Sequence, residues 1–343
     1  MDKKYEFNPN GVGIKNGHFI GLPFEEKDAA VVLFPVPWDV TVSYAAGTSR
    51  APENILSASS QLDLFDLDVP NAWQNGIFMR NSNKNWLKKN DILRKKSVKY
   101  IDFLENGGDI AQSPKMKKTL ATLNQFCEEL REYVYQECKK LLAENKFVAL
   151  VGGDHSTPLG YLQALSECHK EFGILHFDAH CDLRNSYEGF TYSHASIFYN
   201  ALKINNITKI MQVGIRDCCE EEVELAKNSE GKIEIFFDQN LKSDLYNGES
   251  WDSICTKIIQ TLPQKVYVSF DIDSLDPKLC PQTGTPVPGG LEYQEAIYLL
   301  KKLSLSNKEI IGFDLVEVGG SSDWDGNVGA RLLYKMINLF YKK

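Results

Sequence analysis

Six stretches of the chain are almost continuously apolar and rich in β-branched residues, and each one stops abruptly at a cluster of polar residues. Runs of this kind are typical of strands in a parallel sheet that is buried on both faces. The pattern therefore predicts six buried strands. They lie at Ala29–Asp39, Phe147–Ser156, Phe172–Asp182, Lys209–Asp217, Val266–Asp276 and Glu309–Val318.

Between these runs, apolar residues recur at helical spacing. Leu120, Leu123 and Cys127 share one face of a segment before the second run, and Ala296 and Leu300 share a face before the last run. Strands that alternate with helices predict an α/β fold of three layers, with helices on both sides of a central, mostly parallel sheet. Ligands of such sheets bind at the carboxyl ends of the strands, which is where the polar clusters fall.

The segment from Asn81 to Lys115 does not follow this pattern. It is basic at first (NSNKNWLKKNDILRKKSVKY) and then contains several Gly and Asp residues. We interpret it as a surface insertion, a solvated linker, within a single domain that spans residues 1–343.

Composition and charge narrow the class of protein. The chain has 343 residues, of which 43% are hydrophobic and 24% are charged, as in a soluble globular protein with a large core. A start without a charged-then-apolar leader, and the lack of a long apolar span, predict neither secretion nor membrane insertion. The eight cysteines form no CxxC pair or regular framework, which indicates reduced thiols in the cytoplasm. The net charge of −8 and the dispersed basic residues disfavour nucleic acid as a partner and weakly favour a small cationic ligand.

Two of the predicted strands end in closely spaced carboxylates. The stretch HFDAHCD places Asp178, His180 and Asp182 at alternate positions, and VYVSFDIDSLD places Asp271 and Asp273 two residues apart. In an extended chain, side chains two residues apart leave the same face. A single pair of this kind is commonly a cap or a turn, so the interpretation depends on what other strand ends contribute.

A third strand end contributes an imidazole, His155 in the stretch GGDHS. The three ends together offer four carboxylates and two imidazoles, and a parallel sheet can place them side by side. Four clustered aspartates would raise one another's pKa values steeply unless cations offset their charge, and two divalent ions do so. Oxygen ligands with some imidazole and no thiolate favour Mn²⁺ over a structural Zn²⁺. We therefore predict two metal ions with these six ligands: His155, Asp178, His180, Asp182, Asp271 and Asp273.

The motifs GGDHS, FDAHCD and SFDIDSLDP together resemble the three signature motifs of the ureohydrolases, the arginase and agmatinase family of binuclear manganese enzymes. The stretches PWDVTVSYAAGTSRAPENIL, TGTPVPGGL and FDLVEV extend the resemblance from about Val31 to the C-terminus, with the segment from Asn81 to Lys115 outside it. It implies an arginase-like fold, two Mn²⁺ per chain (or Co²⁺ or Ni²⁺), the same six ligands, and a homo-oligomer, either a trimer or a hexamer.

Two further residues enter only through this resemblance. His194, in TYSHAS, matches the family's histidine that moves protons near the substrate, and Glu317, in DLVEV, matches the carboxylate that pairs with a guanidinium. The family's chemistry is the hydrolysis of a C–N bond in a guanidino compound by a hydroxide that bridges the two metals. We expect Asp273 to accept the proton of this nucleophile besides binding metal and to pass it to the departing amine. We expect His194 to protonate that amine or to help recharge the bridging water.

The stretch after the second motif, LRNSYEGFTYSHAS, departs from the arginase type and is similar to agmatinase-like members. We therefore expect agmatine as the substrate, with putrescine and urea as products of polyamine metabolism. An Arg184 that faced the pocket would instead favour a carboxylated substrate, and we expect it at the surface or in a supporting position. The alternatives are arginine, 4-guanidinobutyrate, guanidine or formiminoglutamate as substrate, or a non-catalytic, metal-binding regulatory relative.

Overall fold

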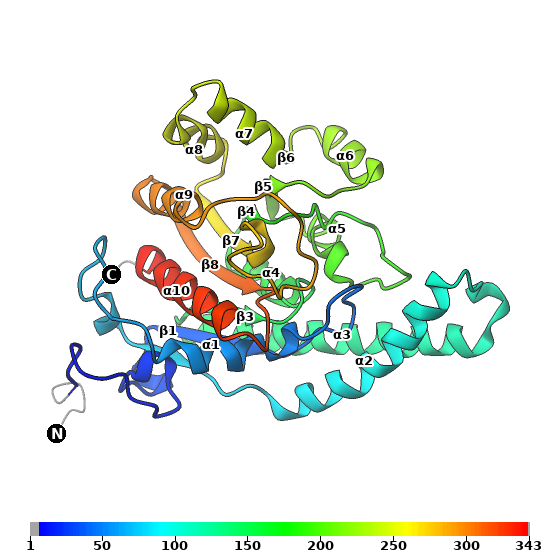
Figure 1. The fold of residues 1–343 in the computed structure, drawn as a ribbon, viewed down its shortest axis with the longest axis horizontal. Coiled ribbons are helices and arrows are strands. Elements are labelled where there is room, and N and C mark those ends of the chain that lie inside the picture. Colours follow the sequence, from blue (N-terminus) through cyan, green and yellow to red (C-terminus); the bar gives the residue numbers. More distant parts are fainter. Residues whose placement is uncertain (1–6, 342–343) are drawn as a thin grey trace.

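The computed structural model of the chain describes residues 7–341. Within these residues, eight strands form one parallel sheet (Figure 1). The strands are β1 (Val31–Val36), β2 (Ile77–Met79), β3 (Phe147–Gly152), β4 (Phe172–Phe177), β5 (Ile207–Ile215), β6 (Ile233–Phe237), β7 (Lys265–Asp271) and β8 (Glu309–Val316). Their order across the sheet is β2-β1-β3-β8-β7-β4-β5-β6.

Helices cover both faces of this sheet (Figure 1). The α-helices are α1 (Ala51–Ser59), α2 (Lys84–Glu105), α3 (Pro114–Ala143), α4 (Leu159–Cys168), α5 (Ile197–Ala201), α6 (Glu220–Lys227), α7 (Asp238–Tyr246), α8 (Trp251–Gln260), α9 (Tyr293–Leu305) and α10 (Asp323–Phe340). Buried side chains of α1, α8, α9 and α10 pack on one face, and those of α2, α3, α4 and α5 pack on the other.

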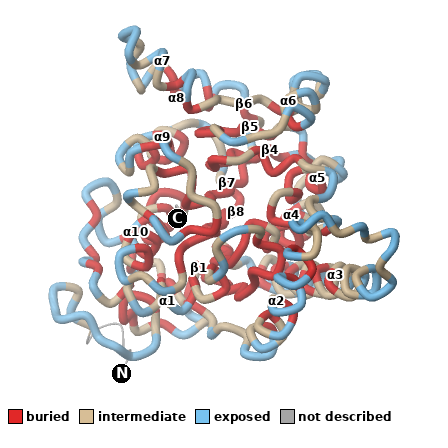
Figure 2. The backbone as a smooth tube through the Cα atoms, turned by 45° about the vertical axis from the view of Figure 1, so that its right-hand side comes forward, coloured by how far each residue is buried: buried red, intermediate tan, exposed pale blue. Residues whose placement is uncertain are grey.

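Alternate residues of each central strand enter the two cores. In β1, Val31 and Leu33 join the core under α1 and α10, whereas Val32 and Phe34 join the core under α2 and α3. A strand with an apolar core on each side has no polar face, which explains the continuous apolar runs in the sequence. Figure 2 shows the sheet as a buried centre with exposed positions on the surrounding helices and loops.

The predicted α/β fold with a central parallel sheet is confirmed, and each of the six predicted strands overlaps one strand of the structure. The prediction missed β2 and β6, which are the two edge strands. β2 has only three residues, and four of the five residues of β6 are only half-buried, so neither produces a long apolar run.

The expectation of a solvated linker is wrong for residues 84–105, because they form α2. Its buried face includes Trp86, Leu93 and Tyr100, which belong to the same core as residues of α3. Whether this segment is an insertion stays a prediction. No helix among residues 7–341 has both the length and the apolar character that crossing a bilayer requires.

Candidate metal centre

Four neighbouring strands bring the predicted site residues together at the carboxyl ends of the strands. The order β3-β8-β7-β4 places the carboxyl ends of these strands in a row. His155 follows β3, Asp178 follows β4, Asp271 is the last residue of β7, and Glu317 follows β8. Residues more than a hundred positions apart in the sequence are therefore neighbours at the edge where parallel sheets bind ligands.

One group of ligands surrounds Nδ1 of His155, and all of its members are buried. This nitrogen lies 3.0 Å from Oδ2 of Asp178, 3.1 Å from Oδ2 of Asp182 and 3.3 Å from Oδ2 of Asp271. Three carboxylate oxygens therefore face a single imidazole nitrogen.

A second group surrounds Nδ1 of His180. This nitrogen lies 3.3 Å from Oδ1 of Asp178 and 3.1 Å from Oδ2 of Asp273. Asp178 thus directs one oxygen into each group. The six residues that the sequence selected are brought together as two adjacent groups of candidate ligands that share Asp178.

Hydrogen bonds behind His155 determine which of its nitrogens carries hydrogen. Nε2 of His155 lies 2.9 Å from Oγ of Ser269, and the Ser269 hydroxyl donates to Oδ2 of Asp314 at 2.8 Å. Because Ser269 gives its hydrogen to Asp314, it accepts one from Nε2 of His155. The neutral ring then presents the lone pair of Nδ1 to the three carboxylates, an arrangement that requires a positive charge between them.

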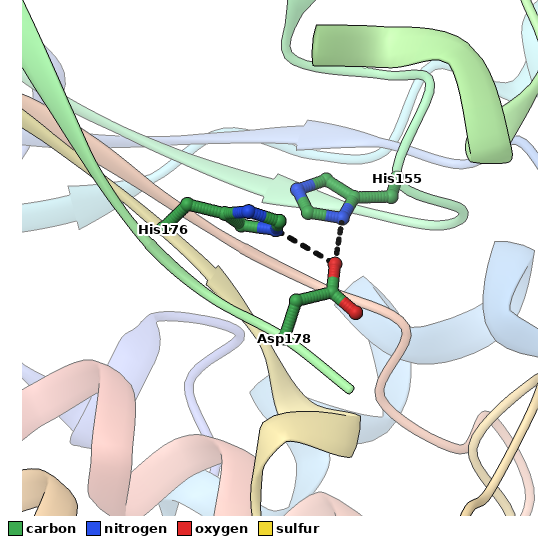
Figure 3. A group of neighbouring side chains, drawn as sticks. All are labelled: His155, His176 and Asp178. Atoms are coloured by element: carbon green, nitrogen blue, oxygen red, sulfur yellow. Dashed lines mark hydrogen bonds and ion pairs between the residues drawn. The ribbon is translucent and has the colours of Figure 1, made fainter. Parts of the chain in front are cut away.

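His176 and His155 both contact the carboxylate of Asp178, as Figure 3 shows. Nε2 of His176 lies 2.7 Å from Oδ2 of Asp178, and the amide nitrogen of Gln212 lies 3.0 Å from Nδ1 of His176. Because this amide nitrogen donates to Nδ1, Nε2 carries the hydrogen and donates to the carboxylate. Although His155, His176 and Asp178 lie close enough together to hold an ion, His176 is therefore a donor that fixes the carboxylate. The role of His176 is therefore structural, and its partner is Asp178.

Burial and crowding affect the acids of this site. Burial and the Asp178 charge raise the pKa of Asp182 to about 7. Burial, together with Asp273 and Asp178, raises the pKa of Asp271 well above its usual range. Burial alone would lower the pKa of His155, but the surrounding carboxylates outweigh it and raise that pKa. All three shifts indicate an excess of negative charge, and the oxygen-rich donors with two imidazoles fit a pair of divalent cations.

Glu317 places a buried carboxylate beside the ligands. Its Oε1 accepts a hydrogen bond from the backbone N–H of His155 at 3.0 Å, and its Oε2 has no hydrogen-bond partner among the described residues. A side chain at Gly284 would begin 2.8 Å from this Oε2, so glycine leaves the oxygen accessible from that side. Glu317 itself has a φ of 59°, a left-handed conformation that is costly for a residue with a side chain and is found mainly at functional sites.

His194 lies on the wall of a cavity of about 260 Å³ that also reaches His180 and Asp182. Its backbone N–H donates to Oγ1 of Thr41 at 3.1 Å. Burial lowers the pKa of His194 to about 3, which keeps its ring neutral. A neutral imidazole has one donor and one acceptor nitrogen and can therefore relay a proton.

Arg184 lies at the surface, as expected, with a side chain that is 37% exposed, but it also lines this cavity. Its Nε lies 3.8 Å from Oε2 of Glu222, and its guanidinium carbon lies 4.9 Å from the centre of the Tyr187 ring. Glu222 offsets the charge of Arg184, and stacking on Tyr187 restricts its position.

Glu222 was not predicted as a site residue. Its carboxylate is buried and accepts hydrogen bonds from the backbone N–H groups of Leu183 at 2.9 Å and Cys219 at 3.0 Å. The second bond is half of a capping box at the start of α6. A capping box in a sequence predicts where a helix starts, but it does not predict that the residue lines a cavity.

The loop after β1 was also not recognised as part of the site. Asp39 accepts hydrogen bonds from the backbone N–H groups of Gly47 at 2.9 Å and Ser49 at 3.2 Å, and it exchanges two hydrogen bonds with Asn90 of α2. The loop so held carries Tyr44 to the cavity wall. Helix α2 therefore supports the site from the segment that looked like a linker.

Comparisons with known proteins agree with this geometry. The model of the arginase family matches residues 29–340. An N(1)-aminopropylagmatine ureohydrolase of Thermus thermophilus is 32% identical over 93% of this chain and 94% of the relative, and an agmatinase of Neisseria meningitidis is 30% identical over 96% and 94%. The crystal structure of an agmatine ureohydrolase of Thermoplasma volcanium, 22% identical, has a TM-score of 0.71 and covers 95% of this chain and 94% of that one. This last likeness shows the fold.

Proposed function

The chain belongs to the arginase family, and on this premise we propose that it is a hydrolase that releases urea from a guanidino compound by cleaving a C–N bond. One observation carries the proposal. Two sets of ligands that share Asp178 lie beside a buried carboxylate, Glu317, one oxygen of which has no partner among the described residues.

We propose that the two sets of ligands hold two Mn²⁺ ions, with Co²⁺ or Ni²⁺ as substitutes. When bound, two divalent cations would neutralise the clustered carboxylates and would make a water molecule acidic enough to act as a nucleophile near neutral pH. The residues that would hold them are His155, Asp178, Asp182 and Asp271 in one set and Asp178, His180 and Asp273 in the other.

The side chains of the site then have separate roles in the reaction. Oε2 of Glu317 accepts N–H groups of the guanidinium in charge-assisted hydrogen bonds and so fixes its position. Asp273 accepts the proton that the attacking water loses and passes it to the departing amine. His194, held neutral on the cavity wall, relays a proton between solvent and that amine.

The substrate that we propose is agmatine or its N(1)-aminopropyl derivative, both of which lack a carboxylate. The charge of Arg184 is offset by Glu222, whereas Asp217, on the same cavity wall, has a side chain that is 68% exposed. This balance favours a cationic tail over a carboxylate. The aminopropyl compound is the second candidate because several of the similar relatives are N(1)-aminopropylagmatine ureohydrolases.

Urea release from a panel of guanidines in the presence of Mn²⁺ tests this proposal. The panel is agmatine, N(1)-aminopropylagmatine, arginine, 4-guanidinobutyrate, guanidine and formiminoglutamate. We expect one of the first two to have the highest kcat/KM, and a preference for arginine or formiminoglutamate would make the substrate assignment wrong. No urea from any member, with two metal ions bound per chain, would instead indicate a non-catalytic relative.

A further inference from the structure

Two cysteines at the edge of the site lie on neighbouring segments of the chain. A parallel β-bridge pairs His180 with Asp217, and the backbone N–H groups of Arg216 and Asp217 both donate to the carbonyl of Ala179, at 2.7 and 3.0 Å. One residue beyond this bridge on each segment, Cys181 and Cys218 are neighbours, and their side chains interact directly.

The backbone spacing at this place suits a disulfide. Paired strands lie about 4.7–4.9 Å apart, and the Cα atoms of a disulfide lie about 4.4–6.8 Å apart. Residues 181 and 218 are therefore close enough for a disulfide to form after a small shift of the two segments that carry them.

The two thiols differ in their access to solvent. Cys181 is fully buried, whereas Cys218 is half-buried and lies on the wall of the cavity that contains His180 and His194. A small oxidant that enters the cavity meets Cys218 first, and Cys181 is the thiol in contact with it. This is the arrangement of a reacting and a resolving cysteine.

The position of Cys181 links this pair to the metal ligands. Cys181 stands between His180, of one set of ligands, and Asp182, of the other. Asp182 has a φ of 55°, so its carboxylate is directed into the site by a left-handed backbone that tolerates little movement. An S–S bond is much shorter than a contact between two thiols, so forming it pulls residue 181 toward residue 218 and displaces the ligands on either side.

From this geometry we propose that Cys181 and Cys218 form a reversible disulfide that disables the metal centre, with a peroxide as the oxidant. The sulfur of Cys218 attacks one peroxide oxygen and the O–O bond breaks, which gives a sulfenic acid and one molecule of water. The sulfur of Cys181 then attacks the sulfur of Cys218, and the hydroxyl leaves with the thiol proton as a second water. Two thiols are oxidised, one peroxide is reduced, and a dithiol reductant reverses the change. This inference does not depend on which substrate the enzyme uses.

The test exposes the full-length protein to hydrogen peroxide and follows three readouts. Peptide mass mapping under non-reducing conditions is expected to show a Cys181–Cys218 link. Equilibrium dialysis against Mn²⁺ is expected to show a loss of affinity of about 10-fold or more, the size of effect typical for disturbed surroundings of a metal site. Urea release is expected to fall with it and to return after dithiothreitol.

Two variants complete the design, each compared with its own untreated state. Cys218→Ser is expected to form no link and to keep its Mn²⁺ affinity under peroxide, and Cys168→Ser, which removes an exposed thiol far from the site, is expected to respond like the unaltered protein. The proposal is overturned if Cys168 is oxidised while residues 181 and 218 remain unlinked. It is equally overturned if the link forms and Mn²⁺ affinity stays the same.

Discussion

Asp271 contributes a negative charge to the site, and asparagine, its uncharged isostere, lacks this charge. Oδ2 of Asp271 lies 3.3 Å from Nδ1 of His155, and its Oδ1 accepts the backbone N–H of Asp273 at 2.8 Å. In the Asp271→Asn variant the shape is kept but one negative charge of the site is lost. We expect fewer than two Mn²⁺ per chain and a fall in urea release of more than about 100-fold, beyond what disturbing a supporting residue costs. Elemental analysis and a urea assay measure both.

The matched control for this variant is Asp276→Asn. Asp276 lies five residues further along the same stretch, outside both ligand sets, and forms a partly exposed ion pair with Lys278. It should keep two metals and full activity. A normal metal content in Asp271→Asn would mean that this carboxylate is not a ligand.

Glu317 should separate substrate binding from metal binding. In Glu317→Gln the side-chain oxygen can still accept the N–H of His155, so we expect both metals to remain. The charge that we propose to hold a guanidinium is lost, and a hydrogen bond to a charged partner contributes about 1.5–3 kcal/mol. KM should therefore rise about 10- to 100-fold, as measured by steady-state kinetics. Glu309→Gln, at the exposed start of the same strand, is the control and should behave normally.

The spacing of residues in the sequence identified the candidate ligands, which stand at strand ends. It did not identify residues whose role depends on a hydrogen bond to a distant part of the chain. Asp178, Asp182 and Asp271 stand at strand ends in recognisable pairs, and the charge argument follows from their number. Ser269 and Asp314, by contrast, support the site only because they are paired across β7 and β8. They lie 45 positions apart, and no local sequence pattern predicts a contact over that separation. Glu222 was not predicted for the same reason, because its role depends on contacts with Leu183 and Arg184, which are distant in the sequence.

At the scale of elements, apolar runs predict buried strands well because a strand that is buried on both faces is apolar at nearly every position. The edge strands β2 and β6 lack such long apolar runs, since an edge strand has fewer neighbours that bury it. Helix α2 was not predicted because its exposed face is rich in lysine. The many charged residues made the helical spacing of Trp86, Leu93 and Tyr100 on its buried face difficult to recognise.

Helix α2 also gives a prediction about how an element supports the site. In Asn90→Ala, Asp39 loses two buried hydrogen bonds, and its carboxylate holds the loop that carries Tyr44. Leaving a buried polar group without its partner costs about 1–3 kcal/mol, and we expect the free energy of unfolding to fall by that amount. Denaturant unfolding measures it, and a rise in KM should accompany it.

Lys96→Ala is the control on the same helix, because Lys96 is exposed. It should change stability by less than about 0.5 kcal/mol. Equal effects from Asn90→Ala and Lys96→Ala would show that α2 is not coupled to the loop.

At the scale of the whole molecule, the site joins segments that are distant along the chain. The proposed ligands lie between residues 155 and 273, and Glu317 follows the last strand, so a metal pair held by these residues would bridge the loops after β3, β4 and β7. Sequence analysis could predict that these ends meet, because parallel strands share one edge, but not that β8 lies between β3 and β7. The strand order depends on the packing of the entire sheet and puts Glu317 between the ends of β3 and β7.

Metal removal should therefore lower the stability of the entire fold and not only the activity. Without cations, buried carboxylates face one another across these loops, as the raised pKa values of Asp182 and Asp271 indicate. A ligand that binds only the folded state at 100 times its Kd stabilises it by about 2.7 kcal/mol for each site. Scanning calorimetry after dialysis against a chelator should show a lower Tm that Mn²⁺ restores. Asp271→Asn supplies the control, since its Tm should respond much less to added Mn²⁺. If the chelated and the Mn²⁺-loaded proteins unfold at the same temperature, the cluster does not bind the metal strongly enough to serve as its centre.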